Sequence, residues 1–179
     1  MEVNQILTTY IPETYLFCYA SSNIDYLTRT LNINQPILYI NAFVKNYVRI
    51  FAGNSKKWKG GIATIYPNSS SKVYGILLVL TNEQLALLDN KQHGYNRQII
   101  TATIEGFNNP NTDIKCFTYI KENILFTHMP SNEYLEQIDL MLRNRIGYKG
   151  NNILIHGIVK NKIQLISVWN GKRGFKMKL

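Results

Sequence analysis

Apolar positions along the chain fall in short runs that polar clusters separate. The aromatic and aliphatic run at 15–19 is continuous, which is typical of a strand buried on both faces. Further strand-like runs follow at 37–44, 47–52, 62–66, 73–80, 97–105, 115–120, 153–159 and 163–169. The polar cluster at 67–71 predicts a turn between two of these strands.

Three segments have the spacing of amphipathic helices. At 24–31 apolar residues recur at helical intervals, and Ser22 or Asn23 just before them can cap the first turn. The segment 81–90 opens with a capping-box pattern, and 131–146 is the longest helical segment. Strands outnumber helices, and few full helical crossovers join them. We therefore predict an α+β fold, with a mixed sheet that closes toward a small β-barrel flanked by helices.

The composition narrows the class of protein. A chain of 179 residues suits one domain, or one domain with an appended hairpin. It has no apolar window long enough for a membrane span, and its first residues do not resemble a secretory signal. Cys18 and Cys116 lie in apolar runs, as buried thiols in a reducing compartment do, so we expect a cytoplasmic protein. Three histidines without ligand spacing predict no metal site.

The net charge of +9 is unevenly placed. Residues 151–179 contain no acid, and their basic residues are Lys160, Lys162, Lys172, Arg173, Lys176 and Lys178. Such a tail favours an anionic partner, although a solubilising surface is the plainer interpretation. A hairpin must also bury its apolar sides, so we expect it to pack on the domain or on a second copy in a homodimer.

The most specific motifs lie in the centre of the chain. Their order is Gly53-Asn54-Ser55, then Trp58-x-Gly60-Gly61-Ile62-Ala63-Thr64-Ile65, then Val73-x-Gly75, then Leu85-x-x-Leu88-Asp89. This order and spacing resemble the gamma-glutamyl cyclotransferase family. Cys116-x-x-Tyr119 and Pro130-Ser131-x-x-Tyr134 are similar to its later strand and last helix. The resemblance implies a domain of this family at 1–150 and leaves 151–179 as a basic C-terminal β-hairpin extension.

The resemblance implies a chemistry as well as a fold. Such enzymes bind a small gamma-glutamyl compound in the barrel's cavity and let its own amine attack the side-chain amide carbonyl. They release 5-oxoproline and a free amine or amino acid, without a metal or organic cofactor. The resemblance assigns substrate binding to Tyr19, Ala20, Ser21, Ser22, Asn23, Tyr95 and Tyr119. The family's glutamate, in an L-D-x-x-E pattern, accepts the proton of the substrate ammonium and returns it to the leaving group.

The chain departs from the family pattern in three places. Gln92 stands at the position of the catalytic glutamate, and an amide cannot accept a proton at neutral pH. Such a loss typically costs on the order of 100- to 10,000-fold in rate. The loop at 19–23 has an extra serine and no glycine, and the link from Gln92 to Tyr95 is short.

Two hypotheses of different class follow. The chain is a cyclotransferase whose glutamate has been replaced, by natural loss or by an engineered exchange, or it is an inactive relative that binds a small molecule or a partner. His93 is a candidate substitute base, although a solvent-facing turn histidine is the plainer interpretation. A nucleic-acid-binding module is a third candidate, which the basic residues favour and no recognition motif supports.

Overall fold

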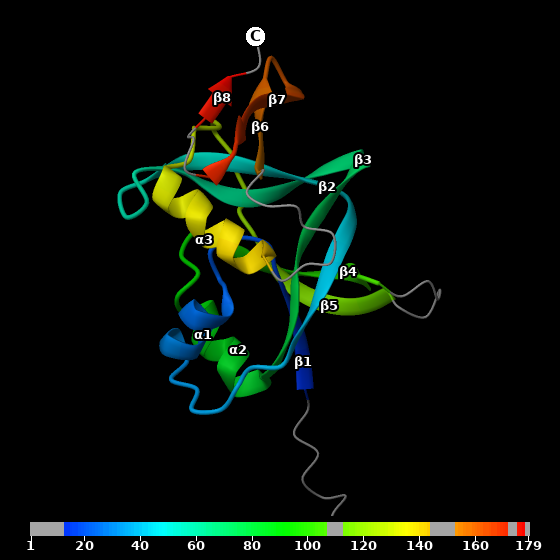
Figure 1. Ribbon diagram of the computed structural model, residues 1–179. Coiled ribbons are helices and arrows are strands. Elements are labelled where there is room, and N and C mark those ends of the chain that lie inside the picture. Colours follow the sequence, from blue (N-terminus) through cyan, green and yellow to red (C-terminus); the bar gives the residue numbers. More distant parts are fainter. Residues whose placement is uncertain (1–12, 107–112, 144–152, 172–174, 178–179) are drawn as a thin grey trace, which may run out of the picture.

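The computed structural model describes residues 13–106, 113–143, 153–171 and 175–177, the last three and Glu13 by their backbone. Within them lie eight strands and three helices (Figure 1). In chain order they are β1 (Glu13–Cys18), α1 (Ile24–Thr30), β2 (Tyr39–Ser55), β3 (Gly60–Thr81), α2 (Asn82–Asp89), β4 (Asn96–Ile104), β5 (Asp113–Ile120), α3 (Asn132–Leu142), β6 (Ile153–Val159), β7 (Lys162–Trp169) and β8 (Phe175–Met177).

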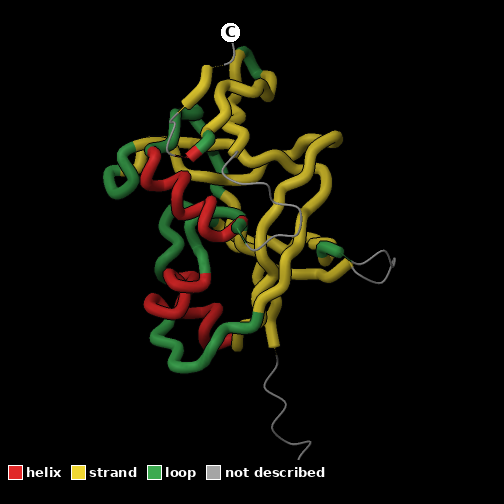
Figure 2. The backbone as a smooth tube through the Cα atoms, viewed as in Figure 1, coloured by secondary structure: helices red, strands yellow, loops and turns green. Residues whose placement is uncertain are grey.

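Five strands close into a barrel. Their order is β3-β1-β5-β4-β2, and β2 pairs back onto β3. The β1–β5 pair is parallel, whereas the other pairs of the barrel are antiparallel. The far half of β2 leaves the barrel and pairs with β6 in parallel, and β7 and β8 extend that sheet. The predicted α+β fold with a mixed, closing sheet is confirmed, and the three helices lie on one side of the barrel (Figure 2).

The two longest strands, β2 and β3, are continuous where the sequence predicts breaks. The predicted turn at 67–71 is wrong, because β3 continues through it as a wide bulge. Lys45 pairs with Lys72 and Tyr47 with Pro67, so four residues of β3 lie opposite Asn46 alone. Asn46 adopts a positive φ of 63°, which asparagine tolerates better than most residues. The two runs predicted at 37–44 and 47–52 are likewise one strand, β2.

Side chains inside the bulge bond to one another where the backbone ladder is interrupted. The Oδ1 atom of Asn68 accepts hydrogen bonds from the hydroxyls of Ser70 and Ser71, at 3.3 and 3.0 Å. Short polar side chains favour such local bonds, and the same tendency makes them frequent in turns. The sequence therefore indicated the correct place for an irregularity but the wrong kind of irregularity.

Local capping fixes the helix starts as predicted. The Asn23 side chain caps α1 by accepting from the Tyr26 N–H, and the capping box of Thr81 and Gln84 opens α2. Ser131 caps α3 in the same way, through the Tyr134 N–H. The predicted extension of this helix to 146 lies partly outside the described residues.

Two glycine positions let backbone segments approach closely. The chain crosses the β2–β3 ribbon on its way to α3, and a Cβ on Gly61 would collide with the carbonyl oxygen of His128. Gly61 donates its N–H to the Met129 carbonyl at 2.9 Å. A Cβ on Gly75 would collide with the Cys18 carbonyl, where β1 ends. These two glycines of the central sequence motifs therefore allow close packing of backbone on backbone.

The C-terminal hairpin shares the core of the barrel domain. β6 and β7 match the two predicted runs, and Ile153, Ile155 and Trp169 belong to the common hydrophobic core. The indole Nε1 of Trp169 donates to Asn132 Oδ1 at 3.0 Å, at the start of α3. The side chains of Lys172, Arg173, Lys176 and Lys178 lie outside the described residues. No helix in the described part is long and apolar enough to span a bilayer.

The Gly75 contact predicts a loss of stability in the variant Gly75→Ala. The added methyl group must displace the end of β1, and such overpacking costs about 1–3 kcal/mol. Urea denaturation measures the free energy of unfolding, with Ser69→Ala, an exposed position of the same strand, as the control. Equal unfolding midpoints for the two variants would show that β1 and β3 are not packed as described.

Candidate active site

A cavity of about 350 Å³ lies beside the barrel, and its lining includes residues of α1 and α3. Its walls come from the end of β1, the turn between β2 and β3, the link after α2, and the first turn of α3. The lining residues are Phe17, Cys18, Tyr19, Ala20, Ser21, Ser22, Tyr26, Ser55, Lys57, Trp58, Ile62, Ala63, Lys91, Gln92, His93, Tyr95, Tyr119 and Tyr134.

Every predicted substrate-binding residue except Asn23 lines this cavity, and so does Gln92. Asn23 is buried beside it, where it caps α1 and donates from Nδ2 to Gln137 at 3.1 Å. The structure thus brings residues separated by about a hundred positions in sequence, from Tyr19 to Tyr119, to one place.

Arg49 holds the loop at 19–22 in position. Its guanidinium donates from Nε to the Tyr19 carbonyl and from Nη2 to the Tyr74 carbonyl, both at 2.9 Å. The hydroxyl of Tyr19, just after β1, reaches the neighbouring strand β5 and donates to the Tyr119 carbonyl at 2.5 Å. The loop is therefore anchored at its first residue to β2, β3 and β5.

Two tyrosines clamp the backbone of Ala63 from the cavity side. The Tyr134 hydroxyl accepts the Ala63 N–H at 2.9 Å, and the Tyr95 hydroxyl donates to the Ala63 carbonyl at 2.7 Å. The ring of Tyr134 also packs against that of Trp58, with centroids 5.0 Å apart. These rings form one wall of the cavity.

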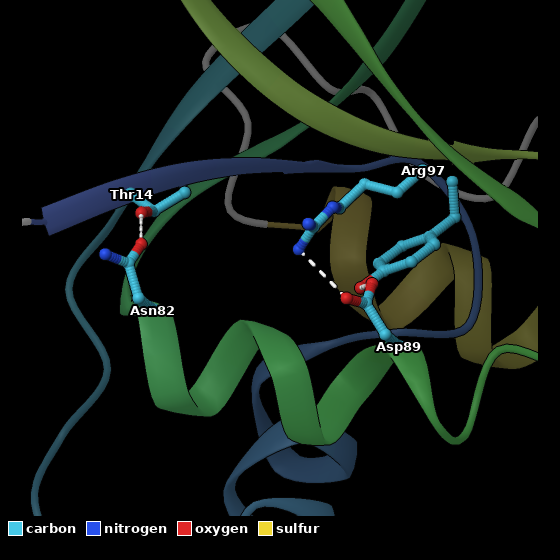
Figure 3. Close-up of polar contacts among 5 residues, drawn as sticks. Thr14, Asn82, Asp89 and Arg97 are labelled. Carbon is cyan, nitrogen blue, oxygen red and sulfur yellow. Dashed lines mark hydrogen bonds and ion pairs between the residues drawn. The ribbon is translucent and has the colours of Figure 1, made fainter.

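Gln92 lies in the link that follows α2 and lines the cavity. The helix α2 itself is fixed at both ends (Figure 3). At its start the Thr14 hydroxyl donates to Asn82 Oδ1 at 2.6 Å. At its end Asp89 accepts from the Tyr119 hydroxyl at 2.7 Å and pairs with Arg97 at 3.0 Å. The short link that follows is closed by a bond of 3.1 Å from the Tyr95 N–H to the Gln92 carbonyl.

The interior of the cavity is polar but uncharged at neutral pH. Burial raises the pKa of Tyr19, of Tyr95 and of Tyr119, and the hydrogen bond to Asp89 raises that of Tyr119 further. Burial also raises the pKa of the Cys18 thiol, which makes it a poor nucleophile. No aspartate or glutamate is among the described residues that line the cavity. Its remaining titratable groups are Lys57, Lys91 and His93, all exposed, and Tyr134, whose pKa burial also raises.

Sequence reasoning missed part of the lining. Trp58 and Tyr134 were noted as motif residues, but their place in the cavity depends on how α3 packs against β3. Ser55 was likewise noted only as a motif residue. Tyr26 and Lys57 gave no signal, because single residues of these types occur on many surfaces. The described residues hold no group of three potential metal ligands.

No model of a protein family matches the chain. A solved structure of a gamma-glutamyl cyclotransferase superposes with a TM-score of 0.67 at 19% identity, over 76% of this chain and 82% of the other. The fold is that of the gamma-glutamyl cyclotransferases.

Two further comparisons agree with this cyclotransferase fold. An uncharacterized human protein superposes with a TM-score of 0.66 at 20% identity, over 76% of this chain and 82% of that protein. Mouse gamma-glutamylcyclotransferase is 22% identical over 117 residues, which are 62% of this chain. The match spans 61% of the length of the mouse protein. The resemblance seen in the sequence is confirmed.

The clamp on Ala63 predicts that Tyr134→Phe destabilises the cyclotransferase fold. The variant keeps the ring but leaves a buried backbone N–H without its acceptor, which costs about 1–3 kcal/mol. Tyr66→Phe removes a hydroxyl from an exposed position of the same strand and is the matched control. Denaturant unfolding compares the two. If the Tyr134→Phe variant were as stable as the control, the Tyr134 hydroxyl would not stabilise the Ala63 backbone as described.

Proposed function

We propose that this chain is a gamma-glutamyl cyclotransferase-like protein that binds a gamma-glutamyl compound in the cavity and, with Gln92, does not release 5-oxoproline at an enzymatic rate. The observation that carries the proposal is the absence of any carboxylate among the described residues of the cavity, in a fold whose reaction needs a proton acceptor. Gln92 lies in this cavity with the loop at 19–22, which supports its alignment with the family's glutamate.

The cavity has the groups that a gamma-glutamyl compound requires. The hydroxyls of Ser21 and Ser22 are donors suited to a carboxylate, and they lie on a loop that Arg49 anchors. The phenol ring of Tyr95 and the indole of Trp58 offer apolar surface for the aliphatic part. A volume of about 350 Å³ lies at the lower end of the range for small-molecule pockets.

The amide of Gln92 can hold such a ligand but cannot transfer its proton. Its oxygen can accept a hydrogen bond from the ligand's ammonium, as a glutamate would. The ammonium must lose a proton before its nitrogen can attack the amide carbonyl, and the leaving amine must gain one. Gln92 supplies neither step, so the ligand remains bound and intact.

One observation favours a second candidate, an active cyclotransferase that uses another base. His93 lies next to Gln92 and also lines the cavity. An imidazole can accept and return a proton near neutral pH. In that case the protein with Gln92 would be active, and His93 would act as the base of the family reaction in place of a glutamate at position 92.

The state of the two cysteines favours one cellular compartment for the protein. Both Cys18 and Cys116 are free and buried, and burial raises the pKa of the Cys116 thiol to about 12. Buried, unreactive thiols suit a reducing compartment. We place the protein in the cytoplasm on this basis.

The decisive variant is Gln92→Glu, assayed for release of 5-oxoproline from L-gamma-glutamyl-L-alanine. We expect a gain on the order of 100- to 10,000-fold, because the exchange restores a proton acceptor without changing the side-chain shape. Gln84→Glu makes the same chemical change in the capping box of α2, outside the cavity, where a glutamate also fits. This control should leave the rate at its initial, very low level.

Two other outcomes are informative. If calorimetry shows that the dipeptide binds, equal and very low rates for the unchanged chain and for the Gln92→Glu variant would indicate a binding protein whose catalytic geometry has also been lost. Rapid turnover by the chain as written would contradict the proposal. If His93→Gln then abolished that turnover, the second candidate would be correct.

A further inference from the structure

The cavity differs in charge between its interior and its mouth. Inside, the polar groups are phenols, hydroxyls and the Gln92 amide, all neutral at pH 7. At the mouth, Lys57 and Lys91 line the cavity with exposed side chains, and we call these two residues the cationic rim. No acidic residue faces them among the described lining residues.

Neither lysine of the cationic rim has an ion pair within the described part of the chain. They come from separate elements, Lys57 from the turn between β2 and β3 and Lys91 from the link after α2. That turn contains three lysines and no acid, at 56, 57 and 59. Both positive charges lie on one small cavity, so an anion that enters it is attracted to each of them.

Aromatic rings hold Lys57 at the mouth. Its Nζ atom lies 5.1 Å from the ring centroid of Trp58 and 5.6 Å from that of Tyr26, both cavity residues. Cation–π contacts of this kind orient an ammonium group without neutralising its charge. The Lys57 ammonium group is therefore held at the cavity, where its positive charge is available to attract an anionic ligand.

We infer that the ligand is a gamma-glutamyl compound whose outer part carries an additional anionic group, such as a side-chain carboxylate. This inference rests on the proposed function, which puts the gamma-glutamyl part against Gln92 and the loop at 19–22. The remainder of the ligand then extends to the cationic rim. Compounds whose outer part is neutral bind more weakly, and those with an additional ammonium group are repelled.

The test compares two dipeptides of the same shape, L-gamma-glutamyl-L-glutamate and L-gamma-glutamyl-L-glutamine, by calorimetry on the chain as written. At low ionic strength we expect the glutamate dipeptide to bind about 5- to 25-fold more tightly, because each exposed ion pair contributes up to about a factor of five. The preference should fall as salt is added, whereas the affinity for the glutamine dipeptide should change less.

Variants assign the preference to the rim. Lys57→Met and Lys91→Met should each reduce it by up to about fivefold, and the double variant should abolish it. Lys115→Met removes an equal charge from an exposed position of β5, outside the cavity, and should leave the preference unchanged. Both Lys57 and Lys91 are exposed, so the variants are expected to fold, which thermal unfolding checks.

Different binding results would contradict the charge inference and the proposed function. If both dipeptides bind with equal affinity, or if the double variant keeps the preference, the charge inference is wrong and the proposed function stands. If neither dipeptide binds, the proposed function fails and the inference fails with it.

Discussion

The outer edge of β3 between Gly61 and Thr64 is the constraint on which the site depends. This segment pairs with β2 on one side, whereas β1 joins β3 only from Ile76 onward. Its outward N–H and C=O groups are buried and must find partners, because an unpaired backbone group in a protein interior is costly. A sixth strand would satisfy them and would also fill the space. Here tyrosine hydroxyls and a crossing loop satisfy them instead.

A cavity exists because side chains occupy the place of a strand. The hydroxyls of Tyr95 and Tyr134 bond to the edge of β3, so their rings lie beside that edge where a strand would otherwise pair. The space between these rings and the loop at 19–22 is the cavity. The same bonds make the cavity wall part of the folded core. A change in the wall is therefore a change in stability, and the residues that hold the site are not free to vary independently of the fold.

Charge is arranged in a similar way around this wall. Arg49 places a guanidinium close behind the loop at 19–22, where it is bound to two backbone carbonyls. Its field lowers the pKa of His156, after the larger effect of burial, and so keeps that imidazole neutral. Among the described lining residues, the interior of the cavity thus presents fixed dipoles, with the anchored Arg49 cation behind the loop, and Lys57 and Lys91 carry their charges at exposed positions. A ligand that enters exchanges water for oriented donors and meets no interior carboxylate among the described lining residues.

Local signals in the sequence predicted local structure well. The capping box of Thr81 and Gln84 needs only four residues, and it was correctly predicted. The bulge at 68–71 was not, because whether a polar cluster reverses the chain depends on the strand it faces, which is distant in sequence. The same limit applies to the site. Motifs indicated Tyr19, Gln92 and Tyr119, but the lysine at position 57 looked like any surface charge until the turn was folded over Tyr26.

The bond between Trp169 and Asn132 has a consequence for the order in which the protein is made. Asn132 begins α3, and two residues later Tyr134 forms part of the cavity wall. Trp169, the partner of Asn132, is synthesised 37 residues after it and later than every strand of the barrel. The barrel segments are thus available to assemble before the ribosome has released the residue that secures the start of α3. The contact between Trp169 and the start of α3 therefore forms only after all five barrel strands have been synthesised.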